Sequence, residues 1–166
     1  MKKFTVMSRN AARRFSFGNI EEKTIIISIT DVCSENNRFH PNPNIVGICE
    51  VKFDDVEKGE QFCITKKDAE KIVNFVRKNE DVDNIIVHCE AGVSRSAGCC
   101  AAIMLVYNGS DMEIFSNPRF CPNMTVYRTV LNAFMGEDNG WIFPEEEATE
   151  KEKISIENWK KANDIE

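Results

Sequence analysis

Several features that mark common classes of protein are missing from this sequence. Only two of its 166 residues are histidine, and none of its seven cysteines has Cys-x-x-Cys spacing, which argues against a structural zinc site. No apolar run is long enough to span a membrane, and the N-terminus lacks the long apolar segment and cleavage site of a secretory signal. We therefore expect no metal, no signal peptide and no membrane partner.

The cysteines and charges indicate the surroundings in which the protein works. The number of cysteines is odd, and most stand in apolar runs at irregular spacing, which favours reduced thiols in a cytoplasmic protein over a disulfide framework. The net charge is −6, and residues 145–166 contribute eight acids and four lysines to it. This acidic balance does not favour a nucleic-acid partner.

The length of the chain favours one domain with a sizeable core. There is no internal repeat and no low-complexity linker before the acidic tail. We expect a single domain at residues 1–143 and an acidic, partly helical C-terminal extension at residues 144–166. Apolar residues of this extension, Ile154, Ile156 and Trp159, would dock it on the domain.

Apolar periodicity along the chain alternates between the strand and helix types. The expected strands are residues 4–7, 24–30, 45–53 and 84–88. The expected helices are a basic turn or short helix at 9–14, a helix capped by Thr65, helices at 96–107 and 111–115, and a last core helix opened by Asn123 or Thr125. This alternation predicts an α/β fold, with helices on a central, mostly parallel sheet of about four to five strands.

The most informative stretch is residues 88–96, which read His-Cys-Glu-Ala-Gly-Val-Ser-Arg-Ser. It joins a buried strand to the start of an apolar helix. Backbone N–H groups in such a loop point into a common hollow at the positive end of the helix dipole, which suits a tetrahedral oxyanion. The loop therefore predicts a phosphate-binding cradle with a nucleophile at its base.

Each polar residue of the stretch has an expected role in that chemistry. Cys89 would ionise readily and attack phosphorus, and Arg95 would bind two phosphate oxygens at once. Gly92 lets the backbone turn tightly around the anion, and Ser96 would donate its hydroxyl to the sulfur as phosphate leaves. We expect His88 to be a fixed, hydrogen-bonded ring that orients the loop rather than a base.

The pattern His-Cys-x-x-Gly-x-x-Arg-Ser resembles the signature of the cysteine-based protein tyrosine phosphatases, and the version here is most similar to their compact dual-specificity branch. The resemblance covers roughly residues 24–134. It implies that fold and a two-step hydrolysis of phosphomonoesters with no metal or other cofactor. The substrate would be a phosphorylated protein or peptide, through phosphotyrosine alone or also phosphoserine and phosphothreonine. The implied phosphate-binding residues, which would also hold a sulfate-like anion, are Glu90, Ala91, Gly92, Val93, Ser94 and Arg95.

The family also uses an aspartate, roughly thirty residues before the cysteine, as general acid and then as base. Two candidates fit, since Asp55 lies 34 residues before Cys89 and Asp54 lies 35 before it. A Phe-Asp-Asp run occurs in the regenerating-liver type of small phosphatase, where the second aspartate is the acid. By that likeness we choose Asp55, with Asp54 as the alternative; both could also simply cap a turn.

Two differences from the family pattern narrow the range of expected substrates. The Trp-Pro-Asp loop of the larger tyrosine-specific enzymes is absent, and the cradle holds Glu90 where lipid-directed members carry lysines, which disfavours polyphosphoinositides. Two alternatives remain: a binding module that recognises phosphate without turnover, and an RNA 5′-phosphatase, which the acidic balance disfavours. A reversible disulfide between Cys89 and Cys49 is a further option that the resemblance raises.

Overall fold

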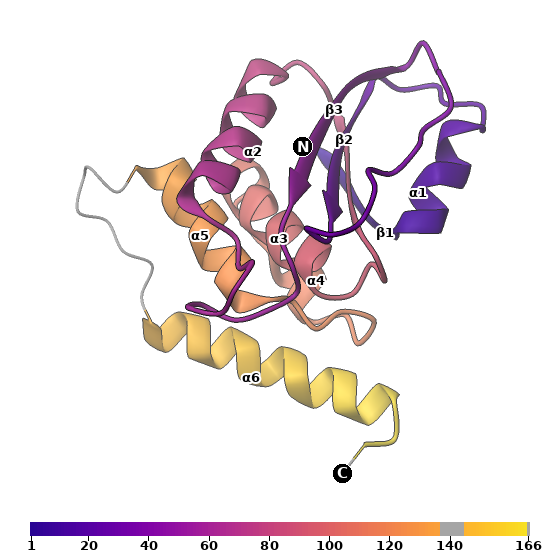
Figure 1. Cartoon of the computed structure of the whole chain (residues 1–166). Helices are drawn as coiled ribbons and strands as arrows, with labels where there is room; N and C mark the ends of the chain where they lie inside the picture. The colour runs from indigo at the N-terminus through magenta and orange to yellow at the C-terminus, as the bar shows by residue number, and fades with distance from the viewer. Residues whose placement is uncertain (137–144, 166) are drawn as a thin grey trace.

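The structure is a computed structural model that describes residues 1–136 and 145–165. Figure 1 shows its helices and strands, coloured from the N-terminus to the C-terminus. They are β1 (Lys3–Ser8), α1 (Arg9–Ser16), β2 (Thr24–Thr30), β3 (Ile45–Lys52), α2 (Lys66–Lys78), β4 (Asn84–Cys89), α3 (Arg95–Asn108), α4 (Met112–Phe115), α5 (Met124–Met135) and α6 (Glu145–Ala162).

The four strands form one parallel sheet in the order β1-β4-β2-β3. This confirms the expected α/β class and the mostly parallel sheet. Every residue of β2 and β4 is buried, because these central strands are covered on both faces, which explains their continuous apolar sequences. All four carboxyl ends lie at one edge of the sheet, the edge where open α/β folds place their ligands.

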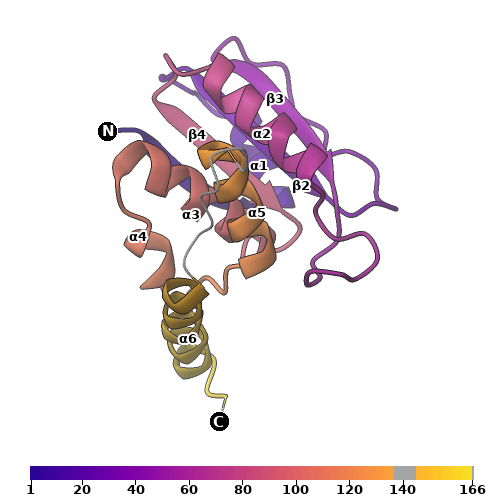
Figure 2. The same ribbon diagram turned by 90° about the vertical axis from the view of Figure 1, so that its left-hand side faces the viewer.

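Helices cover both faces of the sheet unequally (Figures 1 and 2). On one face, α3 packs against β4 and β1 and also against α5, while α2 packs against β3 and α5. On the other face, α1 packs against β1 and β4. Residues 95–104 of α3 are all buried, so this helix is the centre of the core, as its uniformly apolar sequence predicts.

Local signals place the helix ends where the sequence predicts them. Thr65 and Asp68 form a reciprocal capping box at the start of α2. Of the two residues proposed to open the last core helix, Asn123 is the N-cap of α5. At the end of α3, Gly109 adopts the left-handed conformation (φ 76°) that favours glycine at this position.

The C-terminal helix α6 lies across the end of the domain, against α4 (Figure 2). Its fully buried side chains are small: Ala148 joins the apolar core, and the buried Ser155 hydroxyl donates to the Phe120 carbonyl at 3.3 Å. Of the three residues expected to dock the tail, Ile156 is exposed, so the expectation is wrong for this residue. Ile154 and Trp159 are partly buried.

The strongest contact of α6 is an ion pair that its sequence did not reveal. The ammonium group of Lys151 lies 2.8 Å from Asp111 Oδ2, and Tyr127 donates its hydroxyl to the same oxygen at 2.6 Å. Burial first, and then the Asp111 carboxylate, raise the pKa of Tyr127 far above its usual range. The proposed boundary between residues 143 and 144 lies outside the described residues and stays a prediction. Across the part of the chain that the structure describes, no helix is long and apolar enough to cross a membrane.

Candidate active site

The cradle loop joins β4 to α3 at the carboxyl edge of the sheet. Cys89 is the last residue of β4 and Arg95 the first of α3, so the loop between them is short and enclosed. Gly92 has a φ of 70°, and a Cβ there would lie 2.6 Å from the backbone of Met7 and Ser8. Only glycine fits this position, because the loop is pressed against the junction of β1 and α1.

Hydrogen bonds turn the carbonyl groups of the loop outward. The Glu90 carbonyl accepts from the Arg9 N–H at 3.1 Å, and the Val93 carbonyl accepts from the Cys121 N–H at 3.0 Å. The Ser94 carbonyl accepts from the N–H groups of Gly98 and Asn123. These three oxygens are directed to neighbouring segments rather than into the loop, which favours an anion there.

Cys89 lies at the base of the hollow and is 2 % exposed. Its sulfur lies 2.9 Å from the hydroxyl oxygen of Ser96, in the first turn of α3. This places together the two residues that the sequence assigns to the nucleophile and its hydrogen-bonding partner. Among the cysteines outside the loop, burial raises the pKa of Cys49 to about 11 and that of Cys99 well above its usual value, so both are protonated thiols of the core.

Arg95 is buried and held from one side only. Its Nη1 donates to Asp31 Oδ1 at 2.5 Å and to the Phe53 carbonyl at 2.8 Å. Its Nε is buried and has no hydrogen-bond partner among the described residues. A buried guanidinium donor without a partner is costly, and a phosphate oxygen would satisfy it.

Sequence reasoning missed Asp31 as a member of the site. The residue directly follows β2, the strand beside β4, so the parallel order brings it to the same edge as Cys89. The signal was a carboxylate at the end of a buried strand. It could not be used without knowing that β2 and β4 are neighbours.

The two candidate acids lie in different environments. Asp55 Oδ1 accepts from the Ser94 hydroxyl at 2.8 Å and from the Asn123 side-chain amide at 2.9 Å, so this carboxylate faces the cradle. Asp54 Oδ1 instead accepts the backbone N–H of Val32 at 3.0 Å. Asn123, which caps α5, is a second residue of the site that sequence reasoning did not assign.

His88 has every ring nitrogen hydrogen-bonded. Its Nε2 lies 2.7 Å from the Ser28 hydroxyl and 3.4 Å from the Asn37 amide nitrogen, and Nδ1 lies 3.1 Å from the Cys89 carbonyl. Because an amide nitrogen can only donate, Nε2 accepts and Nδ1 carries the hydrogen. Burial chiefly, with the charges of Arg9 and Arg95, lowers the pKa of His88 to about 4. The ring is neutral and fixed.

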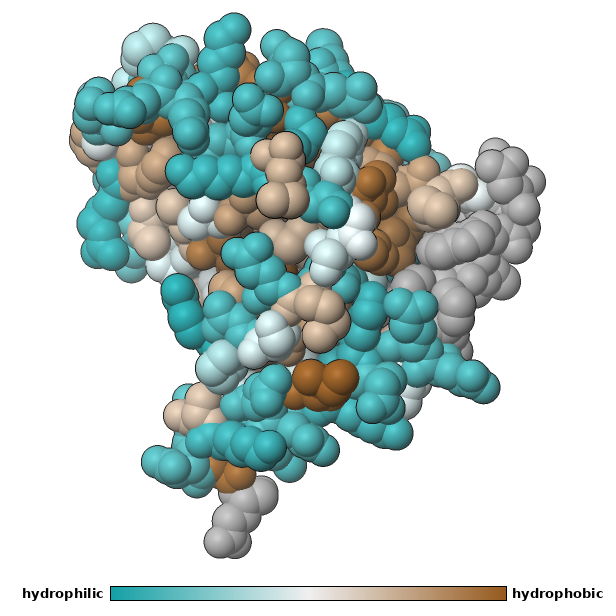
Figure 3. Space-filling view, turned by 180° about the vertical axis from the view of Figure 1, so that it is seen from behind, coloured by the Kyte–Doolittle hydropathy of each residue, from teal (hydrophilic) through white to brown (hydrophobic). Residues whose placement is uncertain are grey.

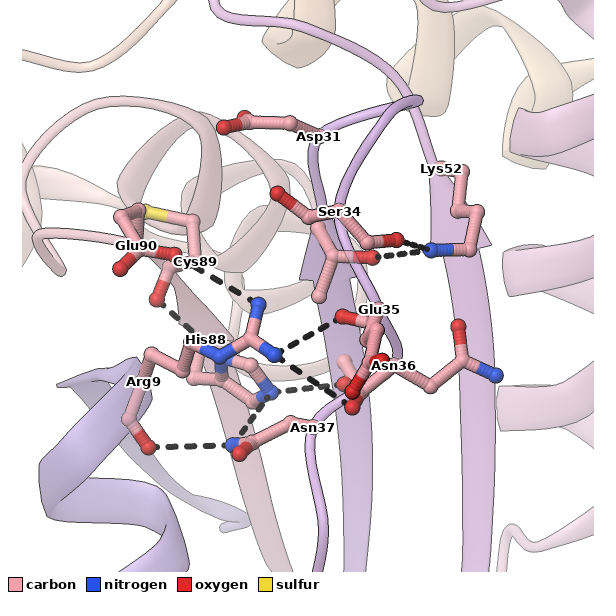
Figure 4. Close-up of polar contacts among 12 residues, drawn as sticks. Arg9, Asp31, Ser34, Glu35, Asn36, Asn37, Lys52, His88, Cys89 and Glu90 are labelled. Atoms are coloured by element: carbon pink, nitrogen blue, oxygen red, sulfur yellow. Dashed lines mark hydrogen bonds and ion pairs between the residues drawn. The ribbon is translucent and has the colours of Figure 1, made fainter.

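Arg9 ties the cradle to the segment that follows β2 (Figure 4). Its guanidinium lies 3.7 Å from the Glu90 carboxylate and donates to the Glu35 carbonyl at 2.8 Å. The Arg9 carbonyl accepts from the Asn37 side chain at 3.0 Å, so one residue contacts both sides of the mouth. The Glu90 side chain is 57 % exposed and therefore stands at the rim rather than inside the hollow.

Within residues 1–136 and 145–165, no group of three or more metal-ligating side chains occurs. The suggested disulfide between Cys89 and Cys49 does not fit the positions of their strands. Cys49 pairs in register with Ile27, which pairs with Val87 two residues before Cys89. Two strand spacings and two residues along the strand separate the two Cα atoms by about 12 Å, beyond the roughly 7 Å that a disulfide spans.

Comparisons with known proteins identify the fold. No family model matches the chain, and no curated protein sequence matches it significantly. Among solved structures, a mouse putative dual specificity phosphatase, crystallised with zinc tungstate, superimposes with a TM-score of 0.57 at 16 % identity, over 86 % of this chain and 88 % of that one. Human DUSP28 superimposes with a TM-score of 0.55 at 14 % identity, over 83 % and 95 % of the two chains.

These neighbours establish the class to which the architecture belongs. The chain has the fold of the cysteine-based phosphatases, in the compact form of the dual-specificity branch. The resemblance seen in the sequence is confirmed at the level of fold.

Proposed function

We propose that the protein is a metal-independent phosphatase that hydrolyses phosphotyrosine in proteins through a phosphocysteine intermediate. One observation carries this proposal: the short loop that joins β4 to α3 holds the buried Cys89 sulfur 2.9 Å from the Ser96 hydroxyl and ends at Arg95, whose buried Nε has no hydrogen-bond partner among the described residues. The dual-specificity phosphatase fold supports it. Asp55, which accepts a hydrogen bond from Ser94 of the loop, supplies the general acid that such a reaction needs.

In the first step, the Cys89 thiolate attacks phosphorus and the bond from phosphorus to the leaving oxygen breaks. N–H groups of residues 90–95 and the Arg95 guanidinium bind the equatorial oxygens, whose charge they stabilise in the transition state. Asp55 gives its proton to the leaving oxygen. Both hydrogen bonds to Asp55 fall on Oδ1, so Oδ2 is the oxygen that carries this proton.

In the second step, water attacks phosphorus and the sulfur–phosphorus bond breaks. Asp55, now ionised, accepts the proton from the water and thereby returns to its starting state. The Ser96 hydroxyl donates to the sulfur as its negative charge returns, which makes thiolate a better leaving group. Inorganic phosphate then leaves the cradle.

The depth of the nucleophile supports phosphotyrosine as the principal substrate. Cys89 is 2 % exposed, so the phosphoryl group must enter on a side chain long enough to reach it. An aryl ring extends the phosphate further from the backbone than the side chain of serine or threonine does. Carboxylates at the mouth, Asp31 and Glu90, oppose ligands with several phosphates, and the unpaired thiols accord with a reducing cytoplasm.

The test is hydrolysis of a small aryl phosphate in the presence of a metal chelator. The wild-type protein should hydrolyse this substrate, and the Cys89→Ser variant should be inactive. Tungstate should inhibit the wild-type hydrolysis competitively. Matched phosphotyrosine and phosphothreonine peptides then define specificity, with the former expected to have the higher kcat/KM. A wild-type protein that binds phosphate but hydrolyses neither aryl phosphates nor phosphopeptides would be a recognition module instead.

A further inference from the structure

A polar groove adjoins the cradle and uses the C-terminal helix as one wall. It has a volume of about 780 Å³, within the range of ligand-binding pockets, roughly 300–1,000 Å³. Asp55 and Ser94 of the proposed active site line its inner end. Glu152 and Ile156, one turn apart on α6, line the opposite wall, and Cys121 and Pro122 also line the groove.

The groove is rigid because both walls are fixed by specific bonds. Asn123 donates its side-chain amide to the Val56 carbonyl at 3.1 Å, and the Lys58 N–H donates to the Thr125 hydroxyl at 3.0 Å. On the other wall, the Lys151 ammonium group is anchored to the buried Asp111 carboxylate, which holds the backbone of α6, the helix that carries Glu152, against the domain. A preformed groove loses little entropy when it binds a chain.

Acidic side chains outnumber basic ones on the lining. The charged lining residues are Asp55, Glu57, Glu60, Glu152, Lys58 and Arg128. Glu152 is half-buried and has no hydrogen bond or ion pair with another described residue. Its charge is felt across the groove: burial and then the Glu152 and Asp55 carboxylates raise the pKa of Cys121.

When a phosphorylated side chain reaches Cys89, the polypeptide that carries it lies at the mouth of the cradle. The groove begins at this mouth. We propose that this groove holds the segment beside the phosphorylated residue and that Glu152 selects a lysine or arginine within it. The inference rests on the proposed function and specifies its substrate class, a phosphoprotein with basic residues next to the phosphotyrosine. Complementary charge at a half-buried site contributes to specificity as well as to capture.

The experiment compares two phosphotyrosine peptides that differ only in flanking residues, lysine in one and glutamine in the other, alongside a small aryl phosphate. The wild-type protein should prefer the lysine peptide by about two- to fivefold in kcat/KM, the range of a partly exposed ion pair. Glu152→Gln should remove this preference, and Glu152→Lys should reverse it. Turnover of the aryl phosphate, which has no flanking residues to contact Glu152, should stay unchanged.

Glu150→Gln is the matched control, since Glu150 is exposed on α6 about 160° around the helix from Glu152. It should keep the wild-type preference, and 0.5 M salt should weaken that preference in both proteins. If Glu152→Gln leaves the peptide ratio unchanged while aryl phosphate is hydrolysed, the groove inference is wrong and the proposed function stands. If Glu152→Gln lowers aryl phosphate and peptide turnover together, selection by Glu152 is also overturned. A wild-type protein inert toward all three substrates would overturn both proposals.

Discussion

Asp31 and Arg95 form a direct ion pair at the edge of the sheet, although 64 residues separate them in the chain. Asp31 Oδ1 lies 2.5 Å from Nη1, so it holds one side of the guanidinium, while the buried Nε has no hydrogen-bond partner among the described residues. Asp31 is therefore a positioning residue: it sets the direction of the donors that would bind phosphate. The parallel neighbours β2 and β4 create this pair.

Removing the charge of Asp31 should weaken phosphate binding. Asp31→Asn should lower kcat/KM for an aryl phosphate about tenfold, because a charge-assisted hydrogen bond that orients Arg95 is lost; the 43 % exposure of Asp31 limits the effect. The inhibition constant for inorganic phosphate should rise by a similar factor. Glu35→Gln, on the same segment but paired only with exposed Arg38 among the described ion pairs, should change neither value.

Variation of the leaving group should distinguish the roles of Asp55 and Asp54. Asp55→Ala should reduce turnover about a hundredfold or more for a phosphate ester whose leaving group is a weakly acidic alcohol. The reduction should be far smaller for an ester of an acidic phenol, which needs no proton in order to leave. Asp54→Ala should show no such dependence, but it should lower the free energy of unfolding by about 1 kcal/mol, since the Val32 N–H loses its acceptor. The opposite pattern of leaving-group dependence would assign the acid to Asp54.

Ser96 should act mainly on the second chemical step. Ser96→Ala removes the hydroxyl 2.9 Å from the Cys89 sulfur and should lower kcat about ten- to a hundredfold. The phosphocysteine would then accumulate, and stopped-flow traces should show a burst of aryl alcohol. Ser110→Ala, beyond the far end of α3, is the control and should behave as wild type. A slow enzyme without a burst would place the effect of Ser96 in the first step.

The buried pair between α6 and the domain should dominate the stability of the C-terminal helix. Lys151→Met leaves Asp111, which is 2 % exposed, with an uncompensated charge and should lower the free energy of unfolding by about 3 kcal/mol. Urea denaturation of the full chain measures this change. Lys153→Met, on an exposed position of the same helix, should have almost no effect. Adding Asp111→Asn to Lys151→Met should recover part of the loss, which charge-independent packing could not explain.

His88 should make the fold sensitive to mild acid. Its pKa falls from about 6.5 in the unfolded chain to about 4 in the folded one, so the unfolded state binds a proton first as the pH decreases. The neutral ring therefore contributes stability that is complete above pH 6.5 and is lost as the pH falls toward 4. Between pH 7 and 5 the loss should be about 2 kcal/mol. Denaturation curves measured across this pH range test the prediction. The free energy of unfolding of His88→Gln should lack this dependence on pH, and that of His40→Gln, which changes an exposed histidine, should retain it.

Local signals in the sequence predicted most of the fold and the centre of the site. The cradle was readable because Cys89, Gly92, Arg95 and Ser96 are close in the chain and lie between a strand and a helix. Asp31 and Asn123 were not, because their positions depend on strand order and on the path between α3 and α5. The ion pair that anchors α6 was not predicted for a related reason: Lys151 has a charged partner 40 residues away, and apolar periodicity carries no information about it.

The close packing of Gly92 on Met7 and Ser8 also sets an order of events during synthesis. Strand β1 leaves the ribosome before its neighbour in the sheet, β4, and the paired residues Ser8 and Cys89 are 81 positions apart. Strand β1 must therefore wait without its partner until β4 has emerged. The loop at residues 89–95 takes its shape only when these two distant strands meet, so a nascent chain forms this loop through a contact of long sequence separation, which is slow to close.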